Sequence, residues 1–144
     1  MSALVDPEAT EALVEDRVPM LRLSQASTIK TPDDVIDELD AVHDVLADVL
    51  VIVRDADKTK RASKAALERR KATLKGTVAG STQAARDAAI TLETAELQDR
   101  VDAAEIAYDY AKGLASLAEK RQSAVQTQAR LVESTMSGSG RYRP

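Results

Sequence analysis

Eight basic side chains are concentrated in the segment from Lys58 to Lys75, which reads KTKRASKAALERRKATLK and contains one acid, Glu68. The eight are Lys58, Lys60, Arg61, Lys64, Arg69, Arg70, Lys71 and Lys75. Residues 1–57 carry a net charge of −10 and residues 76–144 a net charge of −1, so the overall charge of −4 conceals a localised +7. Such a patch is typical of contact with a polyanion, or of ion pairs with acids elsewhere in the same fold.

The spacing of these cations suits a phosphate backbone. On an undistorted helix, five of them fall within about a third of the circumference. The five are Lys60, Arg61, Lys64, Lys71 and Lys75. The segment holds no Tyr, Phe or Trp to stack on bases, so we expect contact with the backbone of single-stranded DNA without base reading.

The other polar residues form no pattern that enzymes use. His43, the only histidine, has no Asp, Glu or Cys at metal-ligand spacing and no neighbouring nucleophile. Paired acids such as Asp33 and Asp34 suit solvation and the helix dipole, and Gly76 and Gly80 lack the Lys-Ser/Thr of a phosphate-binding loop. We therefore interpret the chain as a non-enzyme, with no catalytic residue, metal, cofactor or small-molecule substrate.

The composition favours long helices that associate with other copies. The chain has no Phe or Trp and is rich in Ala, which forms helices well and fills cores poorly, so we expect narrow apolar stripes completed in a homo-oligomer. The absence of Cys excludes disulfides and thiolate chemistry and fits a reducing cytoplasm. No apolar run approaches a membrane span, and we read no signal peptide in MSALVDPEAT, so we expect no membrane partner.

Helix start and stop signals predict an all-α fold, a long antiparallel, coiled-coil-like helical hairpin with a short N-terminal helix. Asp6 and Pro7 predict a helix to about Glu15, and Thr31 with Pro32 begins the first long helix. The predicted divisions are an arm over residues 1–30, a helix over about 32–75, a turn over 76–81, a helix over about 82–136, and a flexible tail over 137–144.

Apolar residues recur at steps of three and four along both long helices, which is typical of a coiled-coil seam. The seam predicted for the hairpin and oligomer consists of Val35, Leu39, Val42, Leu46, Val49, Val53, Ile90, Leu97, Val101, Ala104, Tyr108, Ala111, Ala118, Val125 and Val132. Lys60 interrupts this row on the first helix.

Charge placement predicts how the two helices face each other. A fold about Val78 sets the basic segment opposite residues 81–98, whose acids include Asp87, Glu93 and Glu96. It sets the acidic residues 33–57 opposite the end of the second helix, which carries Lys112, Lys120 and Arg121. Two readings stay open: the lysines are free for DNA, or they are paired with Glu93 and Glu96.

Three stretches carry a resemblance to a known family: AALERRKATLK from Ala65, GTVAGSTQAARDAA from Gly76, and DAAEIAYDYAKGLASLAEKRQSAVQTQARL from Asp102. They are similar to stretches of the UvsY-like recombination mediators of tailed phages, and the likeness covers about residues 35–132. Where the family's basic stretch reads Leu-Lys-x-Arg, this chain has Glu68 in place of Lys, and Arg70 matches.

The resemblance implies a ring-like homo-oligomer that binds single-stranded DNA and helps to load a recombinase against a single-strand-binding protein. It implies no nucleotide hydrolysis, and it places the protein in the cytoplasm of a bacterial host. The alternative is a structural or assembly protein, such as a virion component, adaptor or chaperone, which acts through helix–helix contacts.

Overall fold

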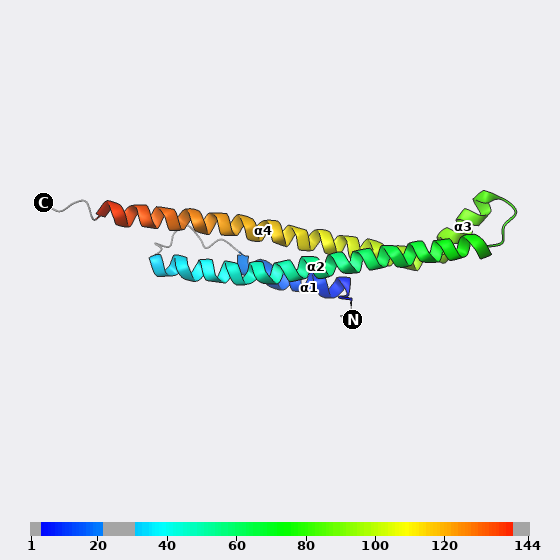
Figure 1. The fold of residues 1–144 in the computed structure, drawn as a ribbon, viewed down its shortest axis with the longest axis horizontal. Coiled ribbons are helices and arrows are strands. Elements are labelled where there is room, and N and C mark those ends of the chain that lie inside the picture. Colours follow the sequence, from blue (N-terminus) through cyan, green and yellow to red (C-terminus); the bar gives the residue numbers. More distant parts are fainter. Residues whose placement is uncertain (1–3, 22–30, 140–144) are drawn as a thin grey trace.

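Two long antiparallel helices lie side by side and form an extended hairpin (Figure 1). A computed structural model describes residues 4–21 and 31–139. The helices are α1 (Pro7–Arg17), the short 3₁₀ helix η1 (Val18–Leu21), α2 (Pro32–Thr77), α3 (Gln83–Glu93) and α4 (Ala95–Ser139). The predicted all-α fold built on a helical hairpin is confirmed.

Helix α2 begins where the sequence predicts. Thr31 Oγ1 accepts a hydrogen bond from the Asp34 amide at 3.2 Å, and Asp34 Oδ2 accepts one from the Thr31 amide at 2.9 Å. This capping box satisfies two of the amides that a helix start leaves unpaired, and Pro32 in the first turn has no N–H that needs a partner. The 46 residues of α2 span about 69 Å. The helix ends at Thr77, just after Gly76.

The predicted single helix over 82–136 is wrong, because residue Thr94 divides it into α3 and α4. Thr94 has φ −103° and ψ 4°, and its buried hydroxyl donates to the Ile90 carbonyl at 2.7 Å. Helix α3 is capped by Thr82, and it bends away from the hairpin at its closed end (Figure 1).

Because α3 turns aside, the register of the hairpin differs from the prediction. The chain does turn near Val78, between the end of α2 and the start of α3. However, Lys60 lies over the ring of Tyr108, and Lys64 pairs with Glu105, so the residues that face each other are not those that a pairing centred on Val78 would bring together. The basic segment therefore faces roughly residues 93–110 instead of 81–98.

Helix α1 packs beside the middle of the hairpin and makes that part three-layered (Figure 1). Its Val14 and Leu21 of η1 join the largest apolar cluster, between α2 and α4. Thr59 Oγ1 donates to the Val5 carbonyl at 2.7 Å, so α1 is anchored near the middle of α2. The helix reaches Arg17, two residues beyond the prediction. Of the predicted arm, residues 22–30 lie outside the described part of the chain, as do 140–144 of the predicted tail.

The residues of the predicted seam lie between the helices. Nine are buried: Val35, Val42, Val49, Ile90, Val101, Ala104, Ala111, Ala118 and Val125. Six are partly buried: Leu39, Leu46, Val53, Leu97, Tyr108 and Val132. They bury little area each, since many are Ala or Val, and at about 25 cal/mol per Å² of apolar surface each contributes modestly.

Candidate nucleic-acid interface

The basic segment occupies the half of α2 that leads to the closed end. Helix α1 starts beside Thr59 and runs toward the open end, so the described helices that pack on the segment beyond Thr59 are α4 and α3 (Figure 1). Among residues 4–21 and 31–139, its outer face is therefore not covered by a further helix.

Two cations at the start of the segment already have partners. Arg61 pairs with Asp57 at 2.9 Å, and Lys60 lies 3.8 Å from the same carboxylate. The Lys60 ammonium also sits 3.6 Å from the centre of the Tyr108 ring, a cation–π contact. This contact explains why a lysine occurs in the apolar row: its stem lies along the seam while its charge meets an aromatic face.

Two further cations are paired near the surface. Lys64 reaches across to Glu105 of α4, and Lys71 lies 3.7 Å from Glu68 one turn earlier in its own helix. The side chain of Lys64 is 50% exposed, so this pair contributes at most about 1 kcal/mol and can exchange for another anion. The reading in which the lysines pair with Glu93 and Glu96 finds no support in the described ranges, since Glu96 pairs with Arg100 of its own helix and the cross-helix partner of Lys64 is Glu105.

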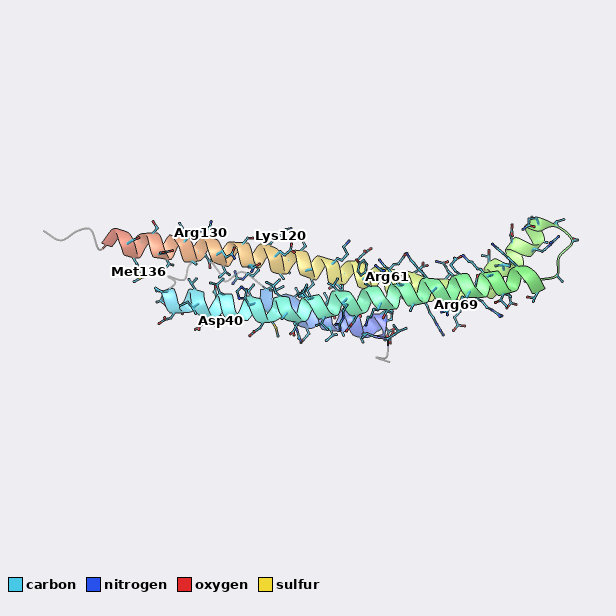
Figure 2. The ribbon with its side chains drawn as sticks, in the orientation of Figure 1. Asp40, Arg61, Arg69, Lys120, Arg130 and Met136 are labelled. Carbon is cyan, nitrogen blue, oxygen red and sulfur yellow. The ribbon has the colours of Figure 1, made fainter. Side chains whose placement is uncertain are left out.

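Four cations of the segment have no carboxylate partner within the described ranges. They are Lys58, Arg69, Arg70 and Lys75, and all four are exposed. The Arg69 side chain donates from Nε to the Ala65 carbonyl of its own helix at 3.3 Å, which leaves its other donors outward. Figure 2 shows Arg69 on the stretch of α2 between α1 and α3.

The unpaired cations do not follow the face that the sequence predicted. Of the predicted strip, only Lys75 has no acidic partner in the part of the chain that the structure describes. Lys58 and Arg69 are eleven residues apart, so on a helix of 3.6 residues per turn they lie within about 20° of each other and about 17 Å apart along the axis. Together with Arg61, which is also exposed, they define what we call the outer line of the segment, on the side of α2 that faces away from α4.

The neighbouring stretch of α3 and α4 is acidic. Residues 76–110 carry a net charge of −5 beside the +7 of the segment, which leaves +2 over residues 58–110. The positive potential is therefore local to α2 and is strongest on its outer line, away from the acids of α4.

The only histidine contacts helix α4. His43 Nε2 lies 3.4 Å from Gln122 Nε2 on an exposed surface. No group of three or more His, Cys, Asp or Glu in residues 4–21 and 31–139 is arranged to hold a metal ion. Within the same ranges, no helix combines the length and apolarity needed to cross a membrane.

The chain matches no family model, no curated protein and no solved structure. The exposed cations of α2 are therefore the main guide to the function.

Sequence reasoning missed the groups that decide which cations are free. Asp57 pairs with Lys60 and Arg61, and Glu105 pairs with Lys64. Neither acid was identified from the sequence as a partner of the segment. The spacing of three or four residues between Asp57 and the two cations after it is a signal that the sequence does contain. The Glu105 contact depends on the register of α4, for which the sequence has no local signal.

Proposed function

We propose that this chain is a non-enzymatic protein that binds single-stranded DNA through the basic segment of α2. The proposal rests on one observation: Lys58, Arg69, Arg70 and Lys75 are exposed and have no carboxylate partner in the described chain. Exposed Lys and Arg release counterions from a phosphate backbone when they contact it, and this release drives binding that does not depend on sequence.

A single strand suits the segment better than a duplex. The four unpaired cations lie on more than one side of α2, and a flexible strand can curve around a helix to reach them. Because the segment has no aromatic residue, the strand is held by its phosphates and its bases are not read. The role of a recombination accessory factor, which loads a recombinase in the bacterial cytoplasm, is supported by the resemblance to UvsY-like mediators.

The test compares two variants that remove the same charge. Arg69→Ala/Arg70→Ala removes two unpaired cations of the segment, and Lys120→Ala/Arg130→Ala removes two cations of α4 that have no ion pair in the described chain (Figure 2). Binding of a fluorescein-labelled oligothymidine is measured by anisotropy across a salt series. Each phosphate contact on a single strand contributes about −0.7 to the slope of log K against log salt, so the first variant should lose about 1.4 of slope.

The control variant should keep the slope and most of the affinity. If both variants weaken binding equally, only net charge matters and the interface is not the α2 segment. If the unmodified protein does not bind the oligonucleotide at low salt, the proposed function is wrong.

A protein that assembles through helix contacts is the second candidate, and two observations favour it. Lys60, Arg61, Lys64 and Lys71 are neutralised within the chain. Large apolar side chains are exposed at both ends of the hairpin, among them Leu92 with 80% and Met136 with 59% exposure. Absence of DNA binding together with self-association would favour this candidate.

A further inference from the structure

An apolar groove lies at the open end of the hairpin, between the first turns of α2 and the last turns of α4. It is lined by Pro32, Val35, Ile36, Leu39, Ala129, Val132, Glu133, Met136 and Ser137. Its volume of about 640 Å³ is within the range of pockets that hold sizeable ligands. Ile36 and Met136 remain more than half exposed, and Figure 2 shows Met136 near the end of α4. The groove therefore has room for apolar side chains from a partner.

The opposite end of the molecule presents an apolar helix face that is exposed in the described part of the chain. On α3, Ala84, Ala88 and Leu92 follow one another at steps of four, and all three are exposed. Ile90 on the other side of α3 is buried, so the helix is apolar on its outer face as well as on its inner face. Helix α3 projects from the closed end, where a second molecule can reach it (Figure 1).

The two ends carry opposite charge. Around the groove, residues 31–44 and 122–139 hold seven acids and one base, a net charge of −6. At the closed end, residues 67–93, which include all of α3, hold five bases and three acids, a net charge of +2. Like ends would repel each other and unlike ends attract, so the charges favour contact between the open end of one copy and the closed end of another.

We propose that two copies of this chain associate head to tail, with the outer face of α3 of one copy seated in the open-end groove of the next. Leu92 enters the groove between Ile36 and Met136, and the cations near the closed end approach the acids near Asp33 and Asp37. Such a contact uses different surfaces on the two copies, so it repeats into a ring or a filament. It goes beyond the proposed DNA binding, which does not require it.

Two variants each destroy one side of this contact. Leu92→Asp places a charge on the outer face of α3, and Ile36→Asp/Met136→Asp places charges in the groove. Sedimentation velocity without DNA should show assemblies of the unmodified protein and single copies of each variant. Removing one buried leucine from the contact should weaken it about tenfold or more.

An equimolar mixture of the two variants is the decisive arm. Each variant keeps one intact surface, and only one intact pair can form between them, so the mixture should contain dimers and nothing larger. Leu131→Asp is the matched control, because Leu131 is 64% exposed on the same part of α4 but does not line the groove, and it should assemble normally. Circular dichroism should show equal helicity for all four proteins.

The proposal is overturned if the unmodified protein is a single copy at high concentration, if either variant assembles as the unmodified protein does, or if the mixture stays monomeric. All the changed residues lie outside the Lys58–Lys75 segment, and the measurement uses no DNA. Failure of this contact and failure of DNA binding can therefore be told apart.

Discussion

The buried ion pair between Arg121 and Glu38 gives the sharpest test of how the hairpin is held together. Arg121 is only 6% exposed, its Nη2 lies 3.5 Å from Glu38 Oε2, and its Nε and Nη1 are buried without a hydrogen-bond partner. A buried cation that lacks two of its hydrogen bonds has lost most of its hydration without full replacement.

The expected effects differ in sign among three variants. Glu38→Leu leaves the guanidinium buried without this carboxylate and should lower the free energy of unfolding by about 3–5 kcal/mol. Glu38→Leu/Arg121→Met removes both charges and both unpaired donors, so it should equal the unmodified protein or exceed it by about 1–4 kcal/mol. Arg121→Met alone should fall between them, because the Glu38 side chain is 23% exposed and can hydrate.

Urea unfolding followed by circular dichroism measures these differences at a fixed protein concentration, which matters if copies associate. The reasoning is refuted if Glu38→Leu has no effect, since Arg121 would then not be desolvated. It is also refuted if the double variant is as unstable as the sum of the single ones, since the pair would then be independent of its burial.

Two other side chains give simpler tests. Thr59 is 7% exposed, and Thr59→Val keeps its shape but removes its hydrogen bond to the Val5 carbonyl. The free energy needed to detach α1 from the hairpin should therefore fall by about 1 kcal/mol. Hydrogen exchange should then become about fivefold faster in α1 and stay unchanged in α4; unchanged exchange in α1 would show that apolar packing alone anchors it. Tyr108→Leu removes the ring under Lys60, and Tyr110→Leu is its control, because no cation lies over the Tyr110 ring in the described chain. Tyr108→Leu should lower the free energy of unfolding by about 0.5–2 kcal/mol more than Tyr110→Leu does. Equal losses from the two tyrosine variants in urea unfolding would exclude the cation–π contact as the cause.

The start of α2 was predictable because its signals are local. Thr31, Pro32 and Asp34 build the cap from neighbouring residues, and no Gly or Pro interrupts the helix before Gly76. Burial along the seam follows from apolar spacing alone, which any helix of this sequence would present on one side.

The break at Thr94 could not be predicted in the same way. The stretch around it contains neither Gly nor Pro, and a threonine that bonds back to the carbonyl four residues earlier is compatible with a continuous helix. The break sets the register, and the register decides that Lys64 meets Glu105. The basic residues of the candidate site could therefore be identified from the sequence. Which of them have no acidic partner in the described chain could not, because that depends on the register.

The proposed DNA binding and the proposed contact between copies both use residues toward the closed end, but they use different cations. Lys58 and Arg69 lie on the outer line of α2, remote from the last turn, whereas Lys75 and Arg86 lie near α3 and its proposed contact with a second copy. A head-to-tail assembly would therefore leave Lys58 and Arg69 free for a strand and present them once in each copy along it.

Leu92→Asp should then keep the salt slope of oligothymidine binding per copy but lose cooperativity along a long strand, because linked sites raise the effective concentration of the next copy. Loss of the slope together with cooperativity would mean that the strand is held at the contact between copies and not on the outer line of α2.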